Sequence, residues 1–422
     1  MIGHRKRQIM RFQFTRALIC SCLVVMAASA YAASTAQVPI PSPWVEGSVT
    51  CATDDWTVAS APEVTVDALA AGTTFQSVAG GLPVGAEHGM VMDGVEALLA
   101  TGTLAYGPEP DLLINNSRGS DAVFQRSYRS NRAFAGYASP GLSSGWVHNY
   151  DIKIESATPK SWGTLDVVYP SGARDTLTPI LNGSGQATGS FKPGGFPFVP
   201  SGRPGPKPGT WKDFVLHWKD GGEWRFRPSL AHEGAYTLYV MSGLEISYDA
   251  KGRIKSVADL QSPKSPLIAW TYDTAGYLKS ISGSDGTLVD YTFEPFTKPA
   301  TPCLKMVSFG YSKTSPADPQ PHFTFDYQDV DGQLLLKEVT MPSPTGSGRA
   351  ACTFEFDDGR LHSFTGPSGS FHEYQYGEGN TAVSVKEASG KLLLTWTQLW
   401  DNLGRNTGNI DAHGNKTTNE YH

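Results

Sequence analysis

The sequence predicts an all-β protein, in which an antiparallel β-sheet domain is followed by stacked β-hairpins. Glycine (45 residues), proline (29 residues) and aromatic residues (11%) are plentiful, whereas only 18% of the 422 residues are charged. Many turn-forming residues together with many aromatic residues are typical of strands joined by short loops. Several segments also alternate between apolar and polar residues, which indicates strands with one buried face.

Residues 1–32 have the order of a secretory signal peptide. Five basic residues stand in a leader without acidic residues, and the apolar run 17–30 ends in the small-x-small site Ala30-Tyr31-Ala32. This run is shorter than the roughly 20 residues that span a bilayer. We therefore expect cleavage after Ala32, no membrane span in the mature chain, and a periplasmic, cell-surface or secreted location.

Charge and cysteine content narrow the range of partners. Removing the leader with its five basic residues changes the formal net charge from −6 to −11, and an acidic chain is not expected to bind nucleic acid. The mature chain keeps Cys51, Cys303 and Cys352, and export permits disulfides. Cys303 and Cys352 are the pair to test; three unconnected thiols are the alternative.

The mature chain divides into three regions. Residues 33–109 have a mixed pattern without an assignable fold, although 64–66 reads as a strand and 93–100 as a short helix. Residues 110–243 predict an antiparallel β domain, and a Pro- and Gly-rich loop is expected over 192–209.

Within the second region, three segments alternate and predict strands: 124–128, 146–154 and 165–169. The turn Asp220-Gly221-Gly222 joins the strand patterns 214–218 and 224–226, which predicts a hairpin.

Residues 244–422 contain about five degenerate repeats. Each unit has an aromatic-x-aromatic pair, then Asp, a turn with Gly, and a return strand that often begins with Arg. Its motif positions are Tyr248, Asp249, Gly252, Arg253, Tyr272, Asp273, Gly276, Phe356, Asp357, Gly359, Arg360, Trp400, Asp401, Gly404 and Arg405. We expect the Asp to accept hydrogen bonds from its own turn and the Gly to adopt positive φ. Because one hairpin alone is marginally stable, neighbouring units must form one continuous sheet.

These units resemble the YD repeats of the Rhs (rearrangement hotspot) family. The preceding block is similar to the domain that comes before Rhs repeats, with Ser143 in place of a glycine; its matching residues are Arg126, Tyr128, Gly141, Gly145, Trp146 and Tyr150. The resemblance covers residues from about 110 to 422. It implies a spiral β-sheet that closes as a hollow shell, often around a toxic C-terminal domain.

The chain departs from that family in three respects. About five units are too few to close such a shell. The sequence stops at His422 directly after Tyr421, where a further unit is expected to begin. Asp318-Pro319 is followed by Gln320 and Pro321 rather than by the glycine of the element that precedes a toxin. We therefore expect a truncated piece, or one that assembles with a further repeat segment or a toxin or effector polypeptide.

Motifs with possible chemistry are better explained as turns. Residues 141–145 match G-x-S-x-G, but a strand pattern follows where a nucleophile elbow needs a helix. Residues 327–338 have partial calcium-loop spacing, but Tyr327 stands at the first ligand position. The repeat aspartates, considered as paired acids of a glycosidase, all follow an aromatic residue. The histidines show no zinc spacing, so no catalytic residue, metal or cofactor is predicted.

The sequence thus predicts an exported structural or interaction protein and not an enzyme. It resembles the N-terminal part of an Rhs-type shell, without a toxin domain, that houses a toxin or serves surface display. A carbohydrate-binding cell-surface module is the alternative, because exposed aromatic rings stack on sugar faces. A hydrolase built on Ser143 is the second and less favoured alternative.

Overall fold

The computed structural model describes residues 37–38, 49–50, 89–92, 95–107, 109–117, 119–156, 161–296, 302–311, 321–342, 350–401 and 404–420. The predicted signal peptide, the segment 64–66 and Cys51 lie outside these residues. Nearly all described elements are strands, and the one described helix is α3 (Ser130–Phe134), which confirms the all-β prediction. In this part of the chain no helix has the length and apolarity needed to cross a membrane.

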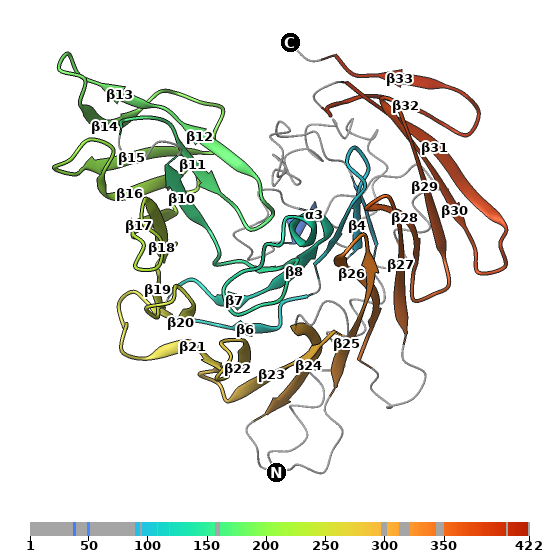
Figure 1. Cartoon of the computed structure of the whole chain (residues 1–422), viewed down its shortest axis with the longest axis horizontal. Coiled ribbons are helices and arrows are strands. Elements are labelled where there is room, and N and C mark those ends of the chain that lie inside the picture. Colours follow the sequence, from blue (N-terminus) through green and yellow to red (C-terminus); the bar gives the residue numbers. More distant parts are fainter. Residues whose placement is uncertain are drawn as a thin grey trace.

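A 24-stranded sheet, the long sheet, runs from β10 to β33, and its neighbouring strands follow one another in the sequence (Figure 1). Strand β10 also pairs with β18, so the first part of the sheet folds back on itself. This part consists of β10 (Lys153–Ser156), β11 (Leu165–Val168), β12 (Arg174–Leu177), β13 (Pro179–Leu181), β14 (Ala187–Phe191), β15 (Phe198–Pro204), β16 (Trp211–Trp218), β17 (Glu223–Pro228) and β18 (Ala235–Met241).

The repeats form the rest of the long sheet as a series of antiparallel hairpins. Its strands are β19 (Leu244–Tyr248), β20 (Ile254–Asp259), β21 (Pro266–Tyr272), β22 (Leu278–Gly283), β23 (Thr287–Pro295), β24 (Pro302–Tyr311), β25 (His322–Val330), β26 (Gln333–Thr340), β27 (Ala351–Asp357), β28 (Arg360–Thr365), β29 (Phe371–Gly377), β30 (Asn380–Lys386), β31 (Leu392–Trp400), β32 (Asn406–Ile410) and β33 (Lys416–Thr418). The predicted continuous sheet of stacked hairpins is therefore present.

A smaller unit, which we call the plug, lies inside the arc of the long sheet (Figure 1). It comprises α3, a five-stranded sheet and a separate hairpin. The five strands are β3 (Gly89–Met92), β4 (Val95–Leu98), β5 (Thr103–Tyr106), β8 (Arg126–Arg129) and β9 (Trp146–His148), and the hairpin is β6 (Leu112–Ile114) with β7 (Ala122–Phe124). A further pair joins β1 (Gln37–Val38) to β2 (Val49–Thr50).

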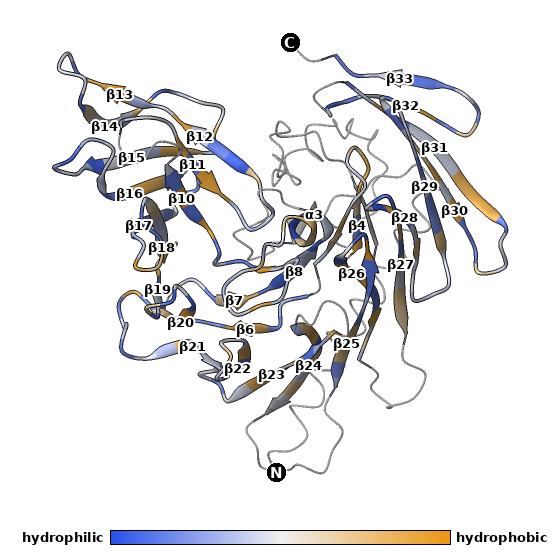
Figure 2. Ribbon diagram, in the orientation of Figure 1, coloured by the Kyte–Doolittle hydropathy of each residue, from blue (hydrophilic) through white to orange (hydrophobic). Residues whose placement is uncertain are grey.

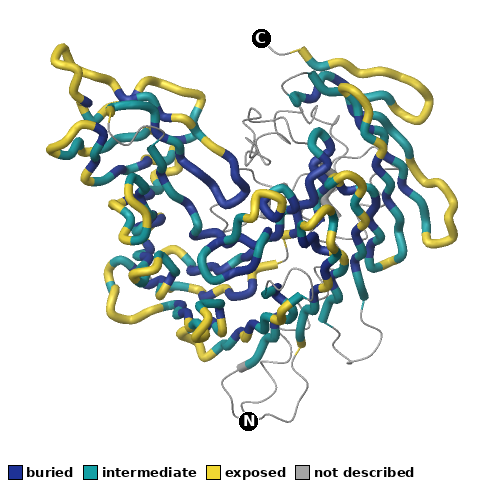
Figure 3. The backbone as a smooth tube through the Cα atoms, in the orientation of Figure 1, coloured by how far each residue is buried: buried dark blue, intermediate teal, exposed yellow. Residues whose placement is uncertain are grey.

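The hydrophobic core lies between the plug and the concave face of the long sheet, the face toward the plug. Hydrophobic and hydrophilic residues alternate along many strands (Figure 2), and the buried residues concentrate on the plug and the strand segments around it (Figure 3). One cluster of buried residues joins Trp146 of the plug to Phe325 and Phe354 of the sheet. Burying a side chain of this size contributes roughly 2–3 kcal/mol, so the plug supplies much of the stability of the concave face.

Three predictions of local structure are wrong. The stretch 93–100 contains strand β4, not a helix, because β4 pairs with both β3 and β5. The stretch 192–209 contains β15, which pairs along its length with β16 but meets β14 at one position only, so its prolines stand on a nearly free edge. The stretch 146–154 is divided between β9 of the plug and β10 of the long sheet.

Of the two alternatives for Cys303 and Cys352, the structure shows no disulfide between them. Cys303 in β24 and Cys352 in β27 are buried thiols that no disulfide joins, and burial raises the pKa of Cys303 to about 11. Strands β25 and β26 lie between their strands. Three strand spacings amount to about 14 Å, beyond the roughly 7 Å that a disulfide allows between Cα atoms.

Candidate functional site at the plug and the repeat turns

The aspartates of most repeats hold their own turns, as predicted. Asp249 Oδ1 accepts hydrogen bonds from the backbone N–H of Lys251 and Arg253 at 2.9 and 3.0 Å. Asp273 Oδ1 does the same for Gly276 and Tyr277 at 2.7 and 2.8 Å. The turn glycines adopt positive φ, namely Gly252, Gly276, Gly359 and Gly404. The Tyr-Asp pattern thus encodes a turn, and these carboxylates are occupied by backbone donors.

The arginine after the turn connects one repeat to the next. Arg253 forms an ion pair with Asp249 at 2.7 Å, and its guanidinium lies 4.4 Å from the ring centroid of Tyr272 in the following unit. Tyr272 in turn donates its hydroxyl proton to the carbonyl of Ile254 at 2.7 Å. Arg405 repeats the ion pair with Asp401 at 2.7 Å. Trp400, beside Asp401, donates from its indole Nε1 to Thr381 Oγ1 at 3.2 Å. At these places the units are therefore joined to their neighbours by side chains as well as by the sheet.

One repeat departs from this pattern. Asp357 pairs directly with Arg360 across a two-residue turn, and both Asp358 (φ 48°) and Gly359 (φ 74°) adopt left-handed backbone conformations. Phe356 precedes this turn and packs, partly buried, against the core. The prediction that each repeat aspartate accepts hydrogen bonds from its own turn is thus wrong at Asp357.

The residues of the block before the repeats come together inside the plug. Arg126, Tyr128, Trp146 and Tyr150 are all buried, and Trp146 meets Tyr128 and Phe325 edge to face, with ring centroids 5.5 and 5.0 Å apart. Edge-to-face pairs of this kind add about 1 kcal/mol beyond the burial of their area. These family-like positions form the interior of the plug and its contact with the repeats.

The two glycines of this block permit close contacts that a side chain would prevent. Gly141 has φ 95°, and a Cβ there would lie 2.5 Å from the ring of Tyr272. Its carbonyl accepts a hydrogen bond from the N–H of Leu278 at 2.8 Å. Gly145 has φ 82° and faces Tyr128 in the same way. The segment around Gly141 therefore allows the plug to pack closely against the second repeat.

A buried ion pair lies where the plug meets the long sheet. Arg126 Nε donates to Asp111 Oδ2 at 2.8 Å, and the two side chains are 0% and 1% exposed. Tyr291 of β23 donates its hydroxyl proton to the same carboxylate oxygen at 2.8 Å. The guanidinium carbon lies 4.7 and 4.8 Å from the ring centroids of Trp146 and Phe325. Burial raises the pKa of Asp111, against the opposing effect of Arg126.

Further polar bonds cross the same boundary. Tyr327 accepts a hydrogen bond from Trp146 Nε1 at 2.9 Å and donates to the carbonyl of Leu304 at 2.8 Å. Tyr128 accepts one from the N–H of Leu336 at 3.0 Å. Sequence reasoning singled out Arg126, Tyr128 and Trp146 but missed the partners on the sheet. A basic residue inside an apolar alternation is a signal that a buried acid lies nearby.

The candidate catalytic and metal motifs are part of this framework. Ser143 is buried, and its Oγ accepts a hydrogen bond from the N–H of Leu304 at 3.0 Å. Asp329 Oδ1 holds the β25–β26 turn through the N–H of Gly332 at 2.8 Å. Among the described residues no group of three or more His, Cys, Asp or Glu side chains is placed to hold a metal ion.

No family model matches the chain, and no curated protein matches it. Solved structures match: TcdB2-TccC3 without its hypervariable C-terminal region is 9% identical with a TM-score of 0.27, covering 76% of this chain and 21% of that one. The Tc holotoxin pore of Photorhabdus luminescens is 9% identical with a TM-score of 0.21, covering 76% of this chain and 22% of that one.

The N-terminal domain of the effector protein SpvB from Salmonella typhimurium strain LT2 is 12% identical with a TM-score of 0.19, covering 69% of this chain and 99% of that one. This chain thus spans about a fifth of the TcdB2-TccC3 chain. At these identities and TM-scores nothing that those proteins do is carried over to this chain. The class that its own geometry defines is an all-β repeat protein with a plugged, open antiparallel sheet.

Proposed function

We propose that this chain is an exported, non-enzymatic scaffold, a wall segment of an Rhs-type shell that houses or displays a polypeptide. The observation that carries the proposal is the order of the long sheet. Each strand from β10 to β33 lies beside its sequence neighbours, so the wall grows by one hairpin at a time. A sheet built in this way extends without changing what is already folded.

The plug explains how such a wall keeps its curvature. Its bonds to the concave face reach strands far apart along the sheet: Tyr291 on β23, Tyr327 on β25, and Thr381 on β30, whose Oγ1 donates to the carbonyl of Leu99 at 2.7 Å. Because one rigid unit bonds to distant strands, the bend between them is fixed. This supports a wall function better than a catalytic one, since these polar groups have structural partners.

Glycan binding through the aromatic rows has less support. The rows include Trp270, Tyr291, Phe354 and Tyr374, which are all buried. A ring that stacks on a sugar needs one face open to solvent. We therefore do not extend the proposal to a glycan-binding surface made by these rows.

A protease-shielding experiment tests the scaffold proposal. A disordered passenger with a protease site is fused after residue 422, and the same passenger is fused ahead of residue 33 in a second protein. We expect slower cleavage of the passenger that follows the long sheet, and loss of this difference in Trp146→Ala, which removes the ring at the centre of the plug. Equal cleavage rates for the two passengers would refute a housing role.

Export is tested separately. The chain with its leader is produced in a secreting bacterial host, and the N-terminus of the exported product is sequenced. We expect the mature chain to begin at Ala33. Retention of the leader in a membrane fraction would contradict cleavage there.

A further inference from the structure

An exposed apolar patch lies at the start of β31, near the C-terminal end of the long sheet. Its residues Leu392, Leu393 and Leu394 are 53%, 49% and 40% exposed. The start of β31 is hydrophobic in Figure 2 and exposed in Figure 3. A single exposed leucine is normal on a protein surface, whereas neighbouring ones form an apolar patch of the kind found at interaction sites.

The same residues lie on a free edge of the long sheet. Strand β31 pairs with β30 along its length, but β32 pairs only with residues 397–400. Among the described strands, none pairs with residues 392–396 on the side of β32. The backbone N–H and C=O groups on this side are therefore available to a further strand. A bulge toward β30 also leaves Leu393 without a cross-strand partner in β30.

The sequence of this edge favours pairing with another apolar strand. Charged residues and prolines, which protect most free edges, do not occur in residues 392–400. The nearest charged residue, Lys391, forms an ion pair with Glu387 at 3.9 Å. The last strand, β33, is by contrast polar and exposed. The start of β31 is therefore an apolar edge without the usual protection.

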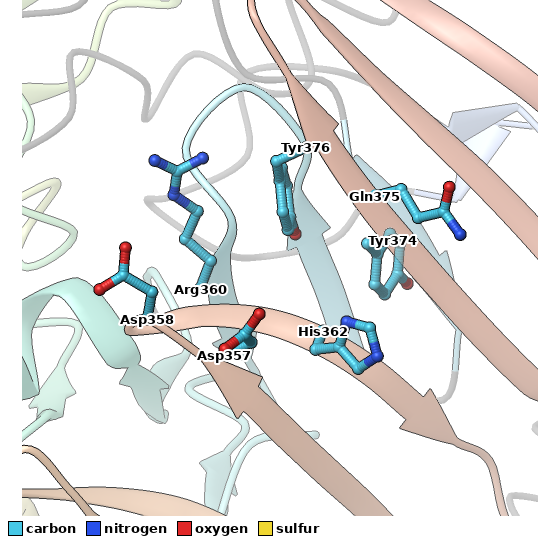
Figure 4. Close-up of a pocket in the computed structure, with 7 residues that line it drawn as sticks. All are labelled: Asp357, Asp358, Arg360, His362, Tyr374, Gln375 and Tyr376. Carbon is cyan, nitrogen blue, oxygen red and sulfur yellow. The ribbon is translucent and has the colours of Figure 1, made fainter.

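The pocket beside it suits an apolar partner less well. This half-open pocket of about 350 Å³ lies at the ends of β27, β28 and β29, and its lining includes Asp357, Asp358 and Arg360 (Figure 4). Covering these groups with an apolar strand would remove charges from water without giving them partners. An apolar partner therefore fits the start of β31 rather than this pocket.

We propose that two copies of this chain associate through antiparallel pairing of residues 391–395 of β31. Pairing about a two-fold axis at Leu393 sets Leu392 of one copy opposite Leu394 of the other, so that each leucine meets a leucine. Such a contact is self-complementary, and no like charges face each other in it. A second copy of the chain is therefore a partner whose edge matches this one.

The position of β32 determines the register of this pairing. Thr397 already pairs with Ile410 on this side of β31, so a second copy has room only as far as Trp396. An axis at Leu394 would set Lys391 of one copy opposite Thr397 of the other, where Ile410 lies. An axis at Leu393 avoids this overlap. The pairing depends on these strands alone and not on the shell function.

Sedimentation velocity of the mature chain, residues 33–422, measures the association. The patch is small compared with the roughly 800 Å² per partner of a stable interface, so we expect a weak dimer with a Kd on the order of 100 µM. Between about 5 and about 500 µM the average mass should rise from that of one chain toward that of two, because dimerisation depends on concentration.

Variants at Leu393 test the two-fold register, because this residue meets its own copy. Leu393→Glu and Leu393→Lys each set like charges opposite each other, which should weaken dimerisation at least about tenfold. Mixing the two variants sets unlike charges opposite each other and should restore association as a heterodimer. Leu230→Glu is the matched control, because Leu230 is 77% exposed between β17 and β18, far along the sheet from β31.

The outcomes are decisive in both directions. A dimer that is lost in each Leu393 variant, restored in their mixture and unchanged in Leu230→Glu supports the proposal. A monomer at all concentrations, as expected if another segment of the same chain covers the leucines, overturns it. Unchanged dimerisation in Leu393→Glu, no association in the mixture, or growth beyond two chains overturns it as well. Urea unfolding of each variant shows that the fold is retained.

Discussion

The buried pair between Asp111 and Arg126 gives the sharpest test of how the plug is held. Its side chains are 1% and 0% exposed, and two guanidinium nitrogens of Arg126 as well as Asp111 Oδ1 have no hydrogen-bond partner. Asp111→Asn keeps the size of the side chain and removes its charge. The guanidinium is then left in the core without a counter-charge, although the hydroxyl of Tyr291 still has an oxygen to bond.

Removing one partner of a buried ion pair typically costs about 3–5 kcal/mol. The rings of Trp146 and Phe325 beside the guanidinium retain about 1 kcal/mol of attraction, so we expect a loss near 3 kcal/mol in the free energy of unfolding. With a urea m-value of about 3 kcal/mol per M, the unfolding midpoint falls by about 1 M. Tryptophan fluorescence follows the transition, because Trp146 lies in the affected core.

The double variant Asp111→Leu with Arg126→Met supplies the control. Replacing both charges by apolar side chains is often neutral or stabilising, so we expect the double variant to be more stable than Asp111→Asn alone. A single-variant loss below about 1 kcal/mol, or a double variant as unstable as the sum of the two single changes, would show that the pair does not carry this energy.

Three further predictions concern the same framework. Gly141→Ala should lower the free energy of unfolding by about 3 kcal/mol through its positive φ and the contact with a tyrosine ring, measured by urea unfolding against Gly185→Ala, whose φ is 74° with open space around it. Burial lowers the pKa of His372 to about 4, so the neutral ring contributes to the free energy of unfolding in full above pH 6.5, and about 3 kcal/mol of that free energy is lost as the pH falls toward 4. His372→Leu should flatten the dependence of the free energy of unfolding on pH, and an unchanged dependence would refute the role of His372. Tyr327→Phe should lower the free energy of unfolding by about 1–3 kcal/mol, because it leaves the indole N–H of Trp146 without its acceptor. Tyr239→Phe, at a half-buried position, should lower it little, and equal losses in the two variants would contradict a specific role of the Tyr327 hydroxyl.

The turns of the repeats could be predicted from the sequence because their hydrogen bonds join residues that are close together in the chain. Asp249 and Asp273 bond to N–H groups within four residues of themselves, and the turn glycines show positive φ. The prediction failed at Asp357 because its turn is shorter: the sequence Asp-x-Gly-Arg is compatible with a two-residue turn and with a longer one. Only the pairing of Asp357 with Arg360 across the hairpin distinguishes the two.

The plug could not be derived from the sequence, because its contacts are long-range. Asp111 and Tyr291 are 180 residues apart in the chain, and the alternation around Arg126 indicates a strand without showing which face meets which partner. The division of 146–154 between two sheets is of the same kind. Between its two strands, Asn149 Nδ2 donates a hydrogen bond to the carbonyl of Val123, 26 residues earlier in the chain, at 2.8 Å.

The plug and the repeats depend on each other for burial of their apolar faces. An open sheet of aromatic hairpins has a concave face that must be covered, and a single sheet cannot cover itself. The plug buries that face, and its polar bonds fix which strand meets it: a slip of one residue would turn Tyr291 and Tyr327 to the other face and leave Asp111 and Trp146 without partners. Register, curvature and cover therefore depend on the same few contacts, which is why we expect Asp111→Asn to loosen the wall as well as the plug.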